Sequence, residues 1–114
     1  MPFIQTKVNV KVSKEKEEAI KSKLGKAIEL LPGKSESWLM LSFEEDCTLY
    51  FKGKKDQPIA FVEVKLFGKA GKDAYDRLTA AISDILHQEL GISQDHVYVK
   101  YEEVPYWGWN GHNF

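Results

Sequence analysis

The sequence repeats its own pattern, and this repeat constrains the fold more than any other feature. Residues 8–12 (VNVKV) are similar to residues 62–66 (VEVKL), an offset of 54 positions (62 minus 8). A common spacing across three elements indicates a duplicated unit rather than chance similarity between amphipathic segments. The further aligned pairs are Leu24 and Leu78, Ala27 and Ala81, Ile28 and Ile82, and, after a four-residue insertion, Gly33 and Gly91, and Phe43 and Tyr101.

Each half predicts a strand, a helix and a strand. Residues 5–12 alternate, with Val8, Val10 and Val12 on one face, which is typical of a strand with one buried face. Ser13 is a good helix N-cap, and Pro32 followed by glycine ends that helix. The expected strands are 38–43, 47–51, 59–67 and 96–104 besides 5–12, with a polar loop over 52–57, a second helix between the 68–71 break and Gly91, and a tail over 105–114.

These elements predict an α+β fold in which two β-α-β units form one sheet with both helices on a single face. A chain of 114 residues is the size of one domain, so we expect a single domain over 1–114. We also expect the other face of the sheet to carry Val, Leu, Phe, Tyr and Trp side chains that need a cover. Self-association would supply that cover, so the sequence predicts an oligomer.

The charge balance gives no reason to expect a nucleic acid or a membrane as partner. Sixteen Lys and Arg against seventeen Asp and Glu leave a net charge of -1. No apolar stretch approaches the roughly 18 residues of a membrane span, and the first residues lack the pattern of a signal peptide. Cys47 is the only cysteine, so no intrachain disulfide can form. We therefore expect a cytoplasmic protein. Export by a route that needs no signal peptide is the alternative.

Pro2 is the most informative residue about chemical function. Cells generally remove an initiator Met ahead of a small residue, proline included, which leaves Pro2 as a secondary amine. An exposed α-amino group titrates near ~8. Burial beside a cation disfavours its charged form twice, so its pKa falls and the amine can act as a base at neutral pH. Many proteins begin Met-Pro without such a role, so Pro2 alone is a weak signal.

No other sequence pattern indicates a phosphate-binding loop or a metal site. Residues 68–72 (GKAGK) lie between a strand and a helix, but the glycine spacing is wrong for a phosphate loop and no Ser or Thr follows the lysine. His87, His96 and His112 show no metal-ligand spacing. We expect neither a metal nor a cofactor.

Several segments in one order resemble the macrophage migration inhibitory factor family and its phenylpyruvate tautomerase relatives. The resemblance covers essentially the whole chain and is most specific at its C-terminal end. The segments are Pro2 at the first strand, Gly33-Lys34 after the first helix, Phe67-Gly68-Lys69, Val97-Tyr98-Val99, and Gly108-Trp109-Asn110 with a terminal Phe114.

The resemblance implies a ferredoxin-like duplicated fold, a homotrimer with active sites between subunits, and keto–enol tautomerisation of arylpyruvates. It implies Pro2 as the base and acid, Lys34 as the cation that binds the substrate carboxylate, and the backbone N–H of Phe67 as a second carboxylate donor. The remaining residues implied by the resemblance are Trp38, Trp107, Trp109 and Phe114 as pocket walls, and Phe3, Tyr98 and Lys100 from the neighbouring subunit.

The sequence departs from the family at four places. Trp38 stands where the family often has Tyr, and Phe67 is bulkier than the usual Ile. Lys100 stands where mammalian members carry Asn at the far end of the substrate ring, which predicts an altered preference for a para-hydroxyl. Residues 59–62 (IAFV) replace the CxxC associated with redox activity, so we expect no thiol oxidoreductase function.

The sequence leaves three functional hypotheses open. The first is a cofactor-free arylpyruvate tautomerase acting on a small 2-oxo acid. The second is a cytokine-like signalling or host-mimic protein that binds a receptor and keeps a vestigial active site. The third is another reaction at the same proline, such as hydration or decarboxylation of an unsaturated acid.

Overall fold

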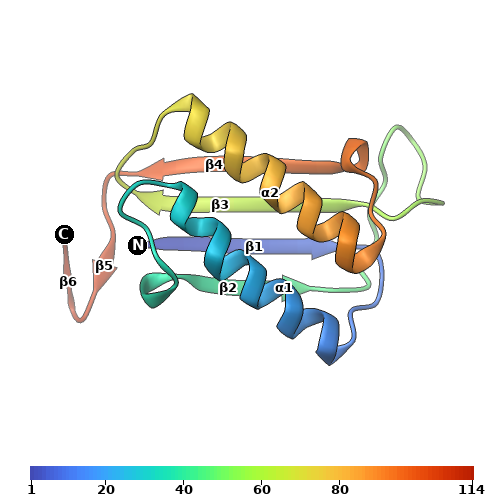
Figure 1. Cartoon of the computed structure of the whole chain (residues 1–114), viewed down its shortest axis with the longest axis horizontal. Coiled ribbons are helices and arrows are strands. Elements are labelled where there is room, and N and C mark those ends of the chain that lie inside the picture. Colours follow the sequence, from blue (N-terminus) through green and yellow to red (C-terminus); the bar gives the residue numbers. More distant parts are fainter.

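The structure, a computed structural model, describes residues 1–114 and confirms the α+β class. Two long helices lie across one face of a four-stranded sheet, and a small hairpin follows at the C-terminal end (Figure 1). The elements are β1 (Pro2–Val8), α1 (Lys14–Ala27), β2 (Met40–Glu44), β3 (Ala60–Phe67), α2 (Lys72–Leu90), β4 (Val97–Val104), β5 (Gly108–Trp109) and β6 (His112–Asn113), with short 3-10 turns at Ile28–Leu30, Glu36–Trp38 and Gln94–His96.

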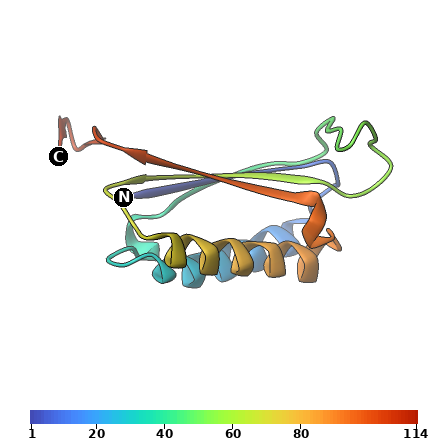
Figure 2. The ribbon, with the colours of Figure 1, turned by 90° about the horizontal axis from the view of Figure 1, so that it is seen from above.

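The sheet has the order β2-β1-β3-β4 and shows the predicted duplication directly. Each helix connects two parallel strands: α1 joins β1 to β2, and α2 joins β3 to β4. The two units meet along the antiparallel pair β1 and β3, in which Ile4 lies opposite Val64. Both helices cover the same face, as Figure 2 shows from the side.

The first strand lies earlier in the chain than its sequence pattern predicted. It begins at Pro2 and ends at Val8, whereas the alternation predicted residues 5–12. The Asn9 side chain explains the end, because it donates to the Gln57 carbonyl at 2.8 Å and accepts from the Ile59 N–H at 2.7 Å. These bonds replace the regular ladder there.

The start of α1 and the end of α2 agree with the expected caps, whereas α1 ends at Ala27 and continues as a 3-10 turn to Leu30, before the stop predicted at Pro32. The Ser13 hydroxyl accepts a hydrogen bond from the Lys16 N–H at 3.2 Å at the start of α1. Gly91 ends α2 with φ 67°, a left-handed conformation that glycine adopts without the steric cost of a side chain. The core between helices and sheet is aliphatic, and its largest fully buried members are Ile4, Ile20, Leu24, Ile28, Leu31, Leu66, Leu78, Ile82, Leu86 and Ile92.

Two predicted strands differ in the structure. The strand predicted over 38–43 begins only at Met40, because Glu36–Trp38 forms a 3-10 turn. The strand predicted over 47–51 does not form: its only ladder contact is an isolated bridge between Phe51 and Lys54. A β-strand needs a partner, and the chain offers none beside residues 48–50, whose backbone N–H groups make no bond to the chain's own backbone.

The open face of the sheet is more polar than expected: it carries the predicted Phe and Tyr side chains, but charged residues lie between them. Strand residues alternate between faces, and the Val and Leu side chains of β1 and β3 lie at the positions that face the helices. Lys7, Glu63, Lys65, Lys100 and Glu102 lie at the alternate positions, together with Gln5 and with the aromatic Phe3, Phe61 and Tyr98.

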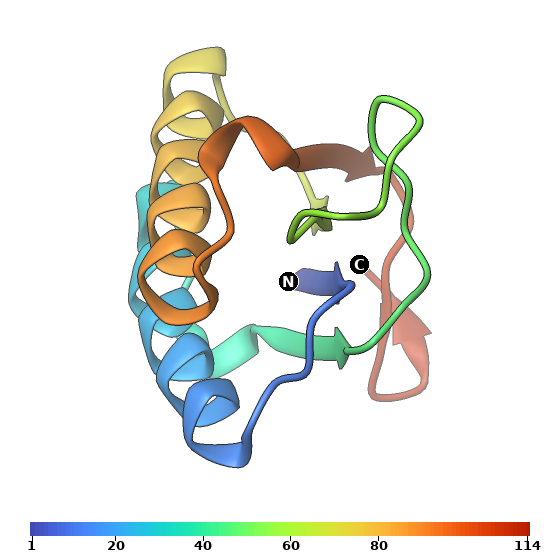
Figure 3. The same ribbon diagram turned by 90° about the vertical axis from the view of Figure 1, so that its right-hand side faces the viewer.

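Two loops rise on the helix-free side at opposite ends of the sheet. The C-terminal hairpin β5–β6 lies near the N-terminus, while the long loop between β2 and β3 lies at the other end of β1 (Figures 1 and 3). The fold therefore brings loops and strand ends together at two separate places.

Candidate active site

A cavity of about 520 Å³ lies at the N-terminal end of β1. It forms because the first residues of the chain, the turn before β2 and the C-terminal hairpin meet at one end of the sheet. The lining residues are Met1, Pro2, Phe3, Ser37, Trp38, Leu39, Met40, Trp107, Gly108 and Trp109.

Pro2 is buried and is held in register by its neighbours in the sheet. It lies opposite Leu66 in the antiparallel pair of β1 and β3. The ladder extends one residue further, because the Phe67 N–H donates to the Met1 carbonyl at 3.2 Å. The backbone at the start of the chain is therefore fixed rather than free.

Lys34 reaches the same end of the sheet and lies close to the terminal amine of Met1. It follows the end of the first helical segment, is half-buried, and donates from Nζ to the Phe67 carbonyl at 2.8 Å. This bond fixes the ammonium beside the first residues of β1. Lys34 takes part in none of the ion pairs of the structure.

The electrostatics of this corner act on the terminal amine of the chain. Burial and the nearby Lys34 ammonium, in that order, lower the pKa of the Met1 amine below its ordinary value of 8.0. Both effects disfavour the charged form. An amine held at this position is therefore a better base at neutral pH than an exposed one.

Aromatic side chains form a connected wall beside Pro2. The Trp38 ring meets Trp109 edge-on at 5.1 Å, and Trp109 stacks on Phe114 at 6.2 Å with 9° between the planes. Phe114 also contacts Phe67 at 5.7 Å, and its backbone N–H donates to the Trp107 carbonyl at 3.1 Å. The C-terminal hairpin and the end of β3 thus enclose one apolar space.

The structure groups most of the predicted site residues but not all of them. Pro2, Trp38, Trp107 and Trp109 line the cavity, and Lys34, Phe67 and Phe114 adjoin its members. Phe3 lines the cavity of its own chain. Its entry into the site of a neighbouring chain, which the resemblance implies, stays a prediction.

Tyr98 and Lys100 do not reach this cavity. Tyr98 lies opposite Phe61 and contacts Phe51 at 5.2 Å, toward the other end of the sheet. Lys100 is bound at Nζ by Glu102 at 2.9 Å and approached by Glu63 at 3.8 Å. Their predicted role in an active site therefore requires a second chain.

The sequence did not identify five residues of the cavity as site residues: Met1, Ser37, Leu39, Met40 and Gly108. Met40 lies opposite Phe3 in the pair of β1 and β2, so a correct register between these strands would have identified it. The sequence pattern predicted that this strand begins at Trp38, whereas the 3-10 turn at Glu36–Trp38 delays the start of β2 to Met40. The register of β2 against β1 therefore did not follow from the pattern.

The fold and this site together define a class of known proteins. A solved structure of MIF2 from Leishmania major has a TM-score of 0.92 and 31% identity, covering 100% of this chain and 97% of that one. A homologue from Prochlorococcus marinus has a TM-score of 0.88 and 30% identity, covering 98% of each chain. Pt0534, solved after inactivation by 2-oxo-3-pentynoate, has a TM-score of 0.85 at 18% identity, covering 96% of this chain and 93% of that one.

The family model described as macrophage migration inhibitory factor (MIF) matches residues 1–114. The chain belongs to the macrophage migration inhibitory factor family. The comparison with curated proteins found no match. None of the helices combines the length and the apolar character that crossing a membrane requires.

Proposed function

We propose that the protein is a keto–enol tautomerase of arylpyruvates in which the amine of Pro2 carries the proton. One observation carries the proposal: a terminal amine with a lowered pKa lies beside Lys34, next to an aromatic cavity. Removal of Met1 would transfer the role of the terminal amine to Pro2, one residue further into the buried strand. The proline is then a neutral secondary amine in an apolar environment.

The proposed reaction moves one proton. The Pro2 nitrogen takes a proton from C3 of the 2-oxo acid, and the C3–H electron pair forms the C2=C3 bond as the ketone oxygen gains charge. The protonated proline then gives its proton to that oxygen, which completes the enol and regenerates the amine. The reverse sequence converts the enol to the ketone, so no oxidant, metal or cofactor enters the balance.

Lys34 and the Phe67 N–H are the proposed carboxylate donors. An ammonium has three donor hydrogens, so Lys34 can keep its bond to the Phe67 carbonyl and still bind a carboxylate oxygen. The Phe67 N–H is occupied by the Met1 carbonyl in the full chain. Loss of Met1 would free this donor at the same step that creates the proline amine.

The aromatic wall suits the ring of an arylpyruvate. Trp38, Trp109 and Phe114 are about half exposed in the single chain, at 48%, 47% and 50%. Large aromatic surfaces this open mark a place where a ligand or another chain is bound. A flat aromatic substrate would cover them and exclude water from the proton transfer.

A homotrimer is part of the proposal, supported by three features of the single chain. Residues 48–50 lie without backbone partners, the outer edge of β2 is unpaired, and Tyr98 is 61% exposed. A neighbouring copy could pair with the unpaired backbone and bring its own Tyr98 and Lys100 to the cavity beside Pro2.

The test is an assay of phenylpyruvate enol–keto conversion together with the intact mass. We expect conversion by protein that lacks Met1, with activity rising with pH through an apparent pKa below 8.0. Treatment with 2-oxo-3-pentynoate, an alkyne-bearing 2-oxo acid, should add one equivalent of the reagent at Pro2 and stop turnover. Protein without Met1 that neither converts phenylpyruvate nor is labelled would contradict the proposal.

A panel of unsaturated acids would then test hydration and decarboxylation at the same proline. A receptor-binding assay would test the signalling alternative.

A further inference from the structure

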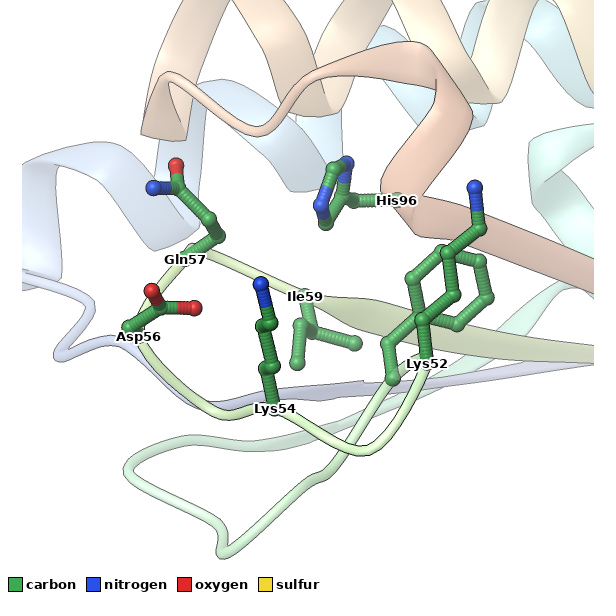
Figure 4. Close-up of a pocket in the computed structure, with 7 residues that line it drawn as sticks. Lys52, Lys54, Asp56, Gln57, Ile59 and His96 are labelled. Carbon is green, nitrogen blue, oxygen red and sulfur yellow. The ribbon is translucent and has the colours of Figure 1, made fainter.

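A second cavity, of about 330 Å³, lies at the opposite end of β1 from Pro2, under the loop between β2 and β3 (Figure 4). Pro2 and Val8 are the first and last of seven residues of β1, so the two ends lie about 20 Å apart at the rise of an extended strand. Neither the proposed tautomerase reaction nor the sequence motifs use this cavity. It is lined by Phe51, Lys52, Lys54, Asp56, Gln57, Ile59 and His96.

A tight turn presents the two lysines of the cavity. Phe51 and Lys54 exchange both backbone hydrogen bonds, at 2.7 and 3.0 Å, around Lys52 and Gly53. The φ angles of 53° at Lys52 and 77° at Gly53 are positive, which is the pattern of a two-residue hairpin turn that favours Asn-Gly. A lysine at the first of these positions costs stability, and such local strain is found preferentially at ligand-binding positions.

The Phe51 ring holds the polar groups in place. The Lys52 Nζ lies 5.5 Å from the ring centroid, and the His96 ring lies 5.3 Å from it. His96 is fixed in turn by Asp95, at 2.8 Å from Nδ1. Figure 4 shows Lys52 and Lys54 extending from the turn toward the side on which the His96 ring lies.

The lysines of the cavity have no protein counter-ion. The ion pairs of the structure involve Lys16, Lys23, Lys72, Lys100 and His96, but not Lys52, Lys54 or Asp56. Two ammonium groups against the single Asp56 carboxylate leave the lining with a positive balance. An anion is therefore the ligand that this lining attracts.

The shape of the lining narrows the kind of anion. Ile59 is buried, with 6% of its surface exposed, and provides an apolar floor between the polar groups. The Gln57 side-chain amide can donate beside the two ammonium groups, while its backbone carbonyl is held by Asn9 at 2.8 Å. Three donors above a small apolar floor match an anionic head group attached to a short organic part.

We propose that this cavity binds a compact organic phosphate monoester. Lys52, Lys54 and the Gln57 amide would donate to the phosphate oxygens, and the organic part would rest on Ile59 and the edge of Phe51. A phosphate dianion offers more acceptors and more charge to two ammonium groups than a carboxylate does. Within one chain the site lies at the opposite end of β1 from Pro2, and none of its lining residues takes part in the proposed tautomerase reaction.

The test is an NMR titration of the isotope-labelled full-length protein with inorganic phosphate and with propyl phosphate, at ionic strength held constant with NaCl. We expect saturable backbone shifts at Lys54, Gln57 and His96, with propyl phosphate binding several-fold tighter than inorganic phosphate because of the apolar floor. Shifts confined to the residues around Pro2 and Lys34, or shifts that do not saturate, would overturn the proposal.

Lys52→Asn is the decisive variant, because Asn suits the turn better than Lys and removes the charge without threatening the fold. Together with Lys54→Gln it should weaken propyl phosphate binding at least tenfold and leave phenylpyruvate turnover unchanged. Lys21→Gln, which removes an exposed lysine of α1, is the matched control and should have no effect. Equal weakening by Lys21→Gln would mean that only the overall charge matters and would contradict a defined site.

Discussion

The Lys34 ammonium donates to the Phe67 carbonyl at 2.8 Å, which ties the segment after α1 to the end of β3 beside the first residues of the chain. This contact joins the two halves of the duplication at one point. It places a cation next to the chain's terminal amine, and the pKa of that amine falls as a result of burial and of this charge. The predicted chemistry depends on this corner of the molecule.

Replacing Lys34 tests that corner. Lys34→Ala should raise KM for phenylpyruvate about tenfold or more, since a hydrogen bond to a charged group contributes on the order of 1.5–3 kcal/mol. Because a nearby cation disfavours protonation of the amine, its removal should raise the amine pKa and shift the rising limb of the pH profile upward. Steady-state kinetics across pH measures both effects, with Lys21→Ala as the control. Unchanged KM and profile would place Lys34 outside the site.

The basicity of the Pro2 nitrogen can be abolished while every residue that lines the cavity is kept. An Ala inserted between Met1 and Pro2 converts that nitrogen into an amide, which has no basic lone pair, and should abolish proton transfer. Pro2→Gly keeps a terminal amine and should retain partial activity. Phenylpyruvate turnover and the oligomeric state are measured on the same samples. Wild-type turnover by the folded insertion variant would refute the proline mechanism.

Lys100 should influence the selectivity between para-hydroxyphenylpyruvate and phenylpyruvate less than an unpaired cation would. Glu102 holds its ammonium at 2.9 Å, and their hydrogen bond and charges raise the pKa of Lys100 and lower that of Glu102. Lys100→Ala should therefore change the ratio of kcat/KM for para-hydroxyphenylpyruvate and phenylpyruvate less than Glu102→Gln does. In Glu102→Gln the Lys100 ammonium keeps only the more distant Glu63 as a partner and should favour the hydroxylated substrate. Equal ratios in all three proteins would mean that Lys100 does not face the substrate.

The oligomer can be tested at the unpaired segment. Light scattering should give a mass of about 39 kDa, three times the 13.1 kDa of one chain. Leu49→Pro and Tyr50→Pro each remove an N–H that makes no backbone bond within the chain, so neither should unfold the monomer. At least one should dissociate the trimer, because successive N–H groups of a strand point to opposite sides. A wild-type monomer, or trimers in both variants, would contradict intersubunit pairing at this segment.

Tyr75 should make the fold sensitive to high pH. Burial and its 2.6 Å hydrogen bond to Glu103 raise the pKa of Tyr75 from 10.0 to about 12. The folded state therefore favours the protonated phenol, and this stabilisation is complete below pH 10 and is lost as the pH rises toward 12. Urea unfolding of wild type should weaken over that range more than unfolding of Tyr75→Phe. The exposed Tyr50→Phe should behave as wild type, and identical curves for all three would refute the linkage.

Much of the fold could be predicted from local patterns. The Ser13 cap, the Gly91 stop and the duplicated β-α-β units follow from residue spacing, because caps and amphipathic faces depend on neighbours in the chain. The end of β1 at Val8 could not be read in this way, since it depends on bonds from Asn9 to Gln57 and Ile59 about fifty residues away. The missing strand over 47–51 has a related cause, because a strand requires a pairing partner and residues 48–50 find none in this chain.

The sequence by itself determined the family, the two-layer architecture and the candidate roles of Pro2 and Lys34, since each depends on residue type and order. Only the tertiary structure decided that Phe3 lines its own chain's cavity, that Tyr98 and Lys100 lie away from it, and that Lys100 is paired with Glu102. These facts depend on strand register. A shift of one residue moves a side chain to the other face of a sheet, and local sequence does not fix which residues of distant strands lie opposite each other.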